Sequence, residues 1–281
     1  MIAQNFEYST PASLKEALAL LSGGDAKILA GGMSLIPMMK LRLATPERLV
    51  DLSRVPGLSG ISEEGGFIHI GAMTTHHEVE DSALLRARCP LLAEAAASIG
   101  DVQVRNMGTI GGSVSHADPA ADYPASLLAL EAKVRLVSAK SDRTLSLEDF
   151  LVDTLTTALE PGEILQEVIV PVEAAGAGVS YQKMVQPASG FAIVGVAARA
   201  TKAAGKPNFA RVGVTGLAGK AYRARNVEKI LLETGDVGKA AAVVADGVDA
   251  NGDLFASSDY RSHMAQVYTA RALTQALARV V

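Results

Sequence analysis

The stretches AGGMSLIP, residues 30–37, and TIGGSVSHADPAAD, residues 109–122, contain the pattern that decides the fold of this chain. We name them the first and the second glycine segment. Each has a glycine pair with a hydroxyl side chain beside it, and each pair follows a short apolar run that we interpret as a strand. Because glycine has no Cβ, its backbone N–H group can approach an anion closely and turn towards it. Two such segments can close on both ends of a long cofactor that carries phosphate.

In the first glycine segment we expect residues 31–34 to direct backbone N–H groups at a pyrophosphate, with the Ser34 hydroxyl as a further donor. A helix that begins near Leu35 would add its N-terminal dipole, which favours the same anion. In the second glycine segment, Thr109 and the pair Gly111-Gly112 are expected to form the facing wall. The alternative for either pair is a turn that ends a strand and binds nothing.

Two aspartates of the second glycine segment, Asp118 and Asp122, are four residues apart and would share one face of the helix that we expect over residues 119–130. Pro119 suits the first position of that helix, which makes Asp118 a natural N-cap. Asp122 has no capping role, so we predict that it accepts a hydrogen bond from a ribityl or ribose hydroxyl. Acid–base catalysis by the pair is not expected, because nothing else in the sequence completes such a site.

The overall composition excludes several classes of protein. With 281 residues, 49% of them hydrophobic and 20% charged, the chain is expected to fold into two or three subdomains. A formal net charge of −4 and the lack of a lysine or arginine run argue against a nucleic-acid partner. No apolar stretch reaches the roughly 18 residues that a membrane-spanning helix needs, and the first residues lack the pattern of a signal peptide. We therefore expect a cytoplasmic protein without a transmembrane segment.

Other familiar sites find no support in the sequence. Cys89 is the only cysteine, which excludes an internal disulfide and a Cys-based cluster within the chain. The five histidines lack metal-ligand spacing, and we expect His76 and His77 to be exposed polar residues near a helix start. No strand precedes a G-x-G-x-x-G motif, no G-x-S-x-G motif occurs, and Gly219-Lys220 lacks the flanking residues of a P-loop.

Periodic patterns divide the chain near residues 57 and 176. Ser13 to Glu16 is typical of a capping box, and Gly23-Gly24 is expected to end the helix that follows. Further along, residues 133–137 alternate with the period of two that a half-buried strand requires. Beyond residue 176, three strand-like runs with short connections come before helical segments. This order favours an α+β fold over a doubly wound sheet.

The two glycine segments resemble those of the FAD-binding medium subunits of molybdenum hydroxylases, especially the aerobic carbon monoxide dehydrogenase type. The FAD domain of xanthine dehydrogenase is a more distant relative. The similarity runs through nearly the whole chain and includes FEYSTP at residues 6–11 and FAIVGVA at residues 191–197. It implies a PCMH-type FAD-binding fold of class α+β. Two N-terminal α/β subdomains, residues 1–57 and 58–175, would sandwich FAD, and residues 176–281 would form an antiparallel sheet with a helical bundle.

The resemblance also implies a set of FAD contacts. These are Ile28, Leu29, Ala30, Gly31, Gly32, Met33, Ser34 and Leu35 at the pyrophosphate and adenine, Thr109, Gly111 and Gly112 at the pyrophosphate and ribityl chain, Asp122 as a polar contact, Leu165 through its backbone, Lys183 near the flavin, and Phe191 over the isoalloxazine. For Lys183 a solvent-facing strand position is the alternative, and for Phe191 a place in the core.

The chain departs from the family pattern at Met33, a position that is more often polar, and at Ser113, where asparagine is common. One cysteine is too few for the extra iron–sulfur insertion of the benzoyl-CoA reductase branch. No histidine lies in a motif for covalent flavin attachment, so the resemblance implies non-covalent FAD.

By the same resemblance, the implied function is that of an FAD-carrying electron-transfer subunit. A large subunit with the molybdenum cofactor would oxidise the substrate, and a small subunit with [2Fe-2S] clusters would pass electrons to FAD in this chain for delivery to an external acceptor. The resemblance implies a dimer of such heterotrimers. Since the cofactors carry the redox chemistry, neither a catalytic residue nor a metal site is expected here. A stand-alone flavoprotein oxidoreductase and a non-enzymatic nucleotide-binding module remain open.

Overall fold

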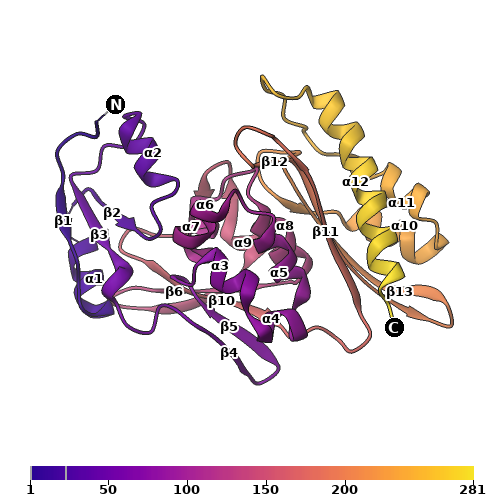
Figure 1. Ribbon diagram of the computed structural model, residues 1–281, viewed down its shortest axis with the longest axis horizontal. Helices are drawn as coiled ribbons and strands as arrows, with labels where there is room; N and C mark the ends of the chain where they lie inside the picture. Colours follow the sequence, from indigo (N-terminus) through magenta and orange to yellow (C-terminus); the bar gives the residue numbers. More distant parts are fainter. Residues whose placement is uncertain (1, 23) are drawn as a thin grey trace.

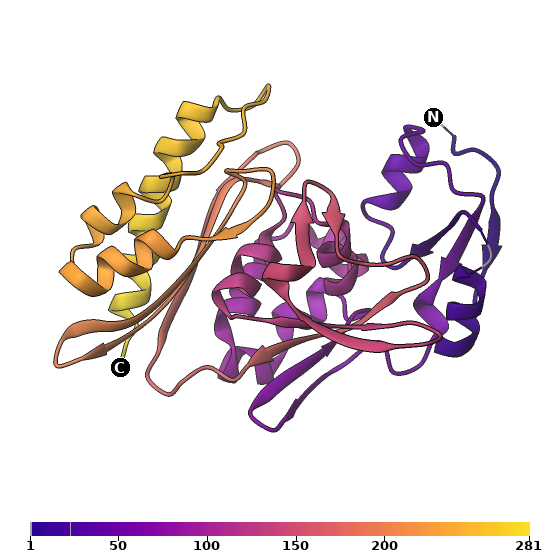
Figure 2. The ribbon, with the colours of Figure 1, turned by 180° about the vertical axis from the view of Figure 1, so that it is seen from behind.

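The computed structural model describes residues 2–22 and 24–281, so the expected helix stop at Gly23 lies outside the described residues. Figure 1 shows three units side by side along the long axis of the molecule, in the order of the sequence. A small N-terminal unit is followed by a middle unit rich in helices, and a long sheet backed by helices ends the chain (Figure 2). The predicted α+β class is confirmed.

The N-terminal unit is built on a parallel sheet with the strand order β1-β3-β2. Its first helix begins as the capping pattern predicts, because the Ser13 hydroxyl accepts the N–H of Glu16, while the Glu16 carboxylate accepts the N–H of Ala12. Ala17 and Val50 belong to the small core between this helix and the sheet. The elements are β1 (Glu7–Ser9), α1 (Leu14–Leu21), β2 (Ala26–Leu29), α2 (Leu35–Lys40), β3 (Arg48–Asp51) and a 3-10 turn, η1 (Leu52–Arg54).

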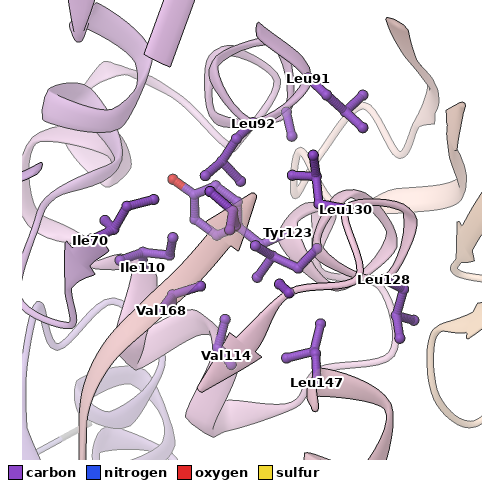
Figure 3. Close-up of a cluster of buried hydrophobic side chains, with 14 of the residues drawn as sticks. Ile70, Leu91, Leu92, Ile110, Val114, Tyr123, Leu128, Leu130, Leu147 and Val168 are labelled. Atoms are coloured by element: carbon purple, nitrogen blue, oxygen red, sulfur yellow. The ribbon is translucent and has the colours of Figure 1, made fainter. Parts of the chain in front are cut away.

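The middle unit is an antiparallel sheet with the strand order β4-β5-β10-β6-β7 and a group of helices packed against it. The fully buried Tyr123 lies in its core among leucine, isoleucine and valine side chains (Figure 3). The elements are β4 (Ile61–Glu64), β5 (Phe67–Gly71), α3 (His76–Asp81), α4 (Ala83–Arg88), α5 (Pro90–Ala97), α6 (Val102–Met107), α7 (Ile110–His116), α8 (Asp122–Ala129), β6 (Lys133–Val137), β7 (Asp142–Ser146), α9 (Leu147–Phe150), β8 (Leu151–Asp153), β9 (Thr156–Thr157) and β10 (Ile164–Pro171).

The C-terminal unit is a four-stranded antiparallel sheet with the order β11-β12-β13-β14. Helix α8 of the middle unit packs on β12 and β13, and the last helix packs on β11 and β12. The approach of α8 is close enough that a Cβ on Gly213 would lie 1.9 Å from the backbone oxygen of Ala125. The elements are β11 (Gly178–Val185), β12 (Ala192–Ala203), β13 (Lys206–Thr215), β14 (Tyr222–Arg223), α10 (Arg225–Thr234), α11 (Val237–Ala242) and α12 (Ser258–Ala278).

Two sequence-based expectations about the second glycine segment are wrong. Its glycine pair does not follow a strand: it lies in the first turn of α7, after helix α6. The helix expected from Pro119 begins only at Asp122, so Asp118 is not its N-cap. The physical reason is a tertiary contact, because the carbonyl of Pro119 accepts bonds from the Gly216 N–H and the Thr215 hydroxyl of the C-terminal unit.

Among the described residues, no helix combines the length and the apolar character needed to cross a membrane.

Candidate cofactor site at the two glycine segments

The structure brings the two glycine segments into contact. A Cβ on Gly31 would lie 2.0 Å from the backbone oxygen of Met107 and 2.6 Å from the Cα atom of Gly108, directly before the second glycine segment. A Cβ on Gly112 would lie 3.5 Å from the Cβ of Ala30. Only a residue without a side chain can occupy position 31 at this distance, so glycine there is required by the approach of the two backbones.

The first glycine segment has free backbone donors. No hydrogen bond within the described residues is donated by the backbone N–H groups of residues 31–35. Gly32 has a φ of +72°, which lies in the left-handed region that glycine adopts without strain. Ser34 precedes α2 as its N-cap, but its hydroxyl makes no capping bond. Successive free N–H groups beside a free hydroxyl are suited to the oxygens of a phosphate.

In the second glycine segment, the backbone N–H groups of residues 110–112 are hydrogen-bonded within the protein. The N–H of Ile110 is donated to the carbonyl of Thr74, that of Gly111 to the carbonyl of Ala72, and that of Gly112 to the Thr109 hydroxyl oxygen. A Cβ on Gly111 would lie 2.4 Å from the Cβ of Ala72. This glycine pair therefore docks α7 against the end of β5. If the second glycine segment contacts FAD as predicted, backbone atoms that approach the cofactor closely and Thr109 would make the contact.

Asp122 and Lys183 form a buried ion pair between the middle and the C-terminal units. The Lys183 Nζ donates to Asp122 Oδ2 and to the carbonyl of Ser98, both at 2.8 Å, and the Tyr181 hydroxyl donates to Asp122 Oδ1 at 2.5 Å. The two charged side chains are only 3% and 4% exposed. Burial raises the pKa of Asp122 to about 6, against the opposite effects of Lys183 and Tyr181. The pKa is raised because removing the Asp122 carboxylate from water costs more free energy than its attraction to Lys183 recovers.

This pair changes the expectation for both residues. Lys183 is not a solvent-facing strand lysine, so that alternative is wrong. Both carboxylate oxygens of Asp122 already accept hydrogen bonds within the protein. The predicted contacts of Asp122 with a cofactor hydroxyl and of Lys183 with the flavin remain predictions.

The other predicted contacts lie at the edges of this region. Leu165 is buried in β10. Phe191, directly before β12, is 42% exposed and so is not the core residue of the alternative interpretation. Ile28 packs on the core of the N-terminal unit, whereas Leu29 lines an apolar pocket of about 350 Å³ on the opposite face of the sheet, together with Tyr8, Ile36 and Met39 among others. Met33 is 39% exposed.

His76 is a residue whose place the sequence interpretation missed. It is 5% exposed, and its ring lies edge-on to that of Tyr123 with 5.3 Å between the ring centroids. The backbone N–H of His76 donates to the carbonyl of Gly108 and so supports the backbone that leads into the second glycine segment. Burial, with a smaller contribution from Arg105, lowers the pKa of His76 to about 4. The helical spacing of His76 and the buried Val79 is a signal that could have placed His76 inside.

The described residues contain no group of three or more His, Cys, Asp or Glu side chains that could hold a metal ion.

The chain is similar to known proteins over nearly its whole length. Residues 4–173 match the family "FAD binding domain in molybdopterin dehydrogenase", and residues 179–276 match "CO dehydrogenase flavoprotein C-terminal domain". The chain is 42% identical over 285 residues to the carbon monoxide dehydrogenase medium chain of Hydrogenophaga pseudoflava, covering 99% of each. It is 38% identical to the 6-hydroxypseudooxynicotine dehydrogenase complex subunit alpha of Paenarthrobacter nicotinovorans, covering 98% of this chain and 95% of that one.

A solved structure of carbon monoxide dehydrogenase from Hydrogenophaga pseudoflava, which lacks the Mo-pyranopterin moiety of its molybdenum cofactor, contains a similar chain. That chain matches with a TM-score of 0.96 and 43% identity over 100% of both. The protein therefore belongs to the family of FAD-binding medium subunits of molybdenum hydroxylases, oxidoreductases of the carbon monoxide dehydrogenase medium-chain type.

Proposed function

We propose that this chain binds FAD non-covalently and relays electrons from a small [2Fe-2S] subunit to an external acceptor. A large subunit with the molybdenum cofactor would complete the complex, as a dimer of heterotrimers. The observation that carries the proposal is the row of free N–H groups at residues 31–35, packed against the second glycine segment. Family membership supports the choice of FAD as the anion that these donors bind.

The residues present fit a pyrophosphate. The backbone donors of residues 31–35 and the Ser34 hydroxyl are free, and the Gly31 contact with Met107 keeps them beside the second glycine segment. In this assignment they hold the pyrophosphate, Thr109 flanks it, and the exposed ring of Phe191 is available to cover the flavin. FAD, when bound, supplies the capacity to accept and release electrons. The chain itself binds and orients, and no side chain has to form a bond with a substrate.

The Asp122–Lys183 pair has a positioning role in this proposal. Lys183 extends from β11, Asp122 begins α8, and Ser98 follows α5, so the three groups fix the C-terminal unit against two helices of the middle unit. The Asp122 carboxylate offsets much of the charge of Lys183 locally. Lys183 therefore holds the flavin side of the site in place and presents only part of a positive charge to it.

The test separates FAD binding from electron relay. The purified chain is mixed with FAD, and bound flavin is followed by absorbance near 450 nm; the flavin-loaded chain is then mixed under anaerobic conditions with the reduced [2Fe-2S] subunit from the same organism. We expect bound flavin, and bleaching of its absorbance only when the reduced partner is present. A chain that stays colourless would contradict FAD binding, and rapid bleaching by a small organic donor without any partner would identify a stand-alone flavoenzyme instead.

A further inference from the structure

The ring of His76 links the core of the middle unit to the backbone that leads into the second glycine segment. Figure 1 shows its helix, α3, beside α6 and α7 on the side of the middle unit that faces the N-terminal unit. The ring lies edge-on to Tyr123, which is fully buried in that core (Figure 3). It also packs on Gly108, because a Cβ there would lie 2.6 Å from His76 Nε2 and 2.8 Å from its Cδ2. Since His76 is only 5% exposed, the ring has little room to move when a neighbour presses on it.

Backbone hydrogen bonds tie the start of the second glycine segment to the residues around His76. The His76 N–H donates to the carbonyl of Gly108 at 2.9 Å, and the N–H of Ile110 donates to the carbonyl of Thr74 at 3.0 Å. These bonds use main-chain atoms alone, so a substitution of the His76 side chain removes neither of them. The ring adds a separate constraint, because it limits how closely Gly108 can approach the core.

Gly108 also contacts the first glycine segment. A Cβ on Gly31 would lie 2.6 Å from the Cα atom of Gly108 and 2.0 Å from the backbone oxygen of Met107. The His76 ring, Gly108 and Gly31 therefore form a row of contacts from the core to the free N–H groups of residues 31–35. A close-packed interior has little empty space to absorb a displacement, so it passes the displacement on. A change at the ring should therefore change the separation of the two glycine segments.

Two polar atoms at the core end of this row have no hydrogen-bond partner within the described part of the chain. They are the Nδ1 atom of His76 and the hydroxyl oxygen of Tyr123, and both are buried. Leaving buried polar atoms unpaired costs free energy, so apolar side chains would serve better in a core built for stability alone. Departures of this kind are expected at functional sites. This observation, which is independent of the contact distances, indicates that His76 has a role beyond the stability of the core.

We propose that His76 is a positioning residue for FAD, whose ring sets the separation of the two glycine segments and so the strength with which residues 31–35 bind the pyrophosphate. The inference rests on the proposed function, because it takes FAD as the ligand of these N–H groups. His76 acts through Gly108. A smaller side chain at position 76 should let Gly108 relax towards the core and away from Gly31. A methyl group on Gly108 should act in the opposite direction and push the backbone towards Gly31.

The test is a double-variant cycle on the full chain freed of FAD, with the FAD dissociation constant measured by fluorescence titration. We expect His76→Ala and Gly108→Ala each to weaken FAD binding about 30-fold. The double variant H76A/G108A should bind more tightly than either, within about fivefold of the wild type, because the new methyl group occupies part of the space that the ring leaves. Gly108 has a φ of −64°, which alanine adopts without strain, so the methyl group acts through its contacts alone.

A matched control separates positioning from stability. Val79 is fully buried in the same core, one turn further along α3. Val79→Ala should lower the free energy of unfolding in urea to a similar extent as His76→Ala, because both leave a cavity. Its FAD dissociation constant should nevertheless stay within about twofold of the wild type. A merely structural role for His76 predicts instead that FAD affinity follows stability in every variant.

The outcomes distinguish this inference from the proposed function. An FAD affinity of His76→Ala within about twofold of the wild type would overturn the inference and leave the proposed function intact. A double variant that binds FAD no more tightly than the single variants would do the same. Should His76→Ala not fold, His76→Asn takes its place in the cycle, with the same expected order of affinities. A wild-type chain that binds no FAD would overturn both.

Discussion

The two glycine segments have the same local sequence pattern, but they differ in whether their backbone N–H groups are free to bind a ligand. In the first glycine segment the backbone N–H groups of residues 31–35 are free, and Gly31 touches the backbone at Met107. In the second glycine segment the N–H groups of residues 110–112 are satisfied within the protein, because Thr109 caps a helix that starts immediately before the glycine pair. A glycine pair therefore marks close backbone approach, and whether donors remain for a ligand depends on where the next helix begins.

The largest expected effect comes from placing a methyl group at the contact of the two glycine segments. In Gly31→Ala the new Cβ would lie 2.0 Å from the Met107 oxygen, so the segments must separate. We expect FAD affinity to fall by at least about a thousandfold, equivalent to about 4 kcal/mol. Fluorescence titration of the apo chain with FAD measures it. The control Gly238→Ala, on helix α11, should bind FAD like the wild type; an affinity of Gly31→Ala within about twofold of the wild type would show that the contact does not matter.

The second expected effect is a dependence of stability on pH that comes from His76, which supports the second glycine segment. The pKa of His76 is lowered to about 4 in the folded chain, from its usual value of 6.5. Between these pH values the unfolded chain binds a proton at His76 that the folded chain does not, so the contribution of His76 to stability should fall on acidification from 6.5 to about 4, by on the order of 3 kcal/mol. The raised pKa of Asp122 acts in the opposite direction over much of this range, so the contribution of His76 is the difference between two profiles of urea unfolding. The wild type should lose about 3 kcal/mol relative to His76→Phe across this range, whereas a control with His77→Gln should follow the wild type. Parallel profiles for all three proteins would refute the assignment.

The substitution Gly111→Ala distinguishes the docking of α7 against β5 from the binding of FAD. In Gly111→Ala the Cβ would lie 2.4 Å from the Cβ of Ala72, so α7 must move away from the end of β5. We expect a loss of about 2 kcal/mol in the free energy of unfolding, measured with urea, and a smaller loss of FAD affinity than in Gly31→Ala. The opposite order of affinities would mean that the second glycine segment, not the first, holds the anion.

The smallest expected effect is at Met33, where the chain departs from its family. If the backbone N–H is the donor, Met33→Ser should change FAD affinity by less than about threefold, because surface substitutions away from special features cost within about 0.5 kcal/mol. Isothermal titration with FAD measures it. An increase of tenfold or more would show that the side chain at this position contacts the cofactor.

Local patterns predicted much of the fold. The alternating run at residues 133–137 is β6, the strand–helix order of the last part is correct, and the capping residue Ser13 begins α1. Long-range contacts were not predictable from such patterns. Pro119 is suited to a helix start, but its carbonyl is bound by β13, and α8 begins three residues later.

The same limit applies to the candidate site. The sequence indicated the free donors of the first glycine segment, because a glycine pair before a helix leaves N–H groups without partners. It did not indicate that Lys183 is held by Asp122, since 61 residues separate them and only the packing of β11 on the middle unit brings them together. His76 was missed because two adjacent histidines appear polar, although helical geometry places one inside and one outside.

Amide hydrogen–deuterium exchange with and without FAD tests the central claim most directly. Free N–H groups exchange readily, and bonded groups are protected. In the chain without FAD we predict rapid exchange at residues 31–35 and protection at residues 110–112; with FAD, protection should appear at residues 31–35. Unchanged exchange at residues 31–35 in an FAD-saturated chain would contradict the assignment of these N–H groups as the pyrophosphate site.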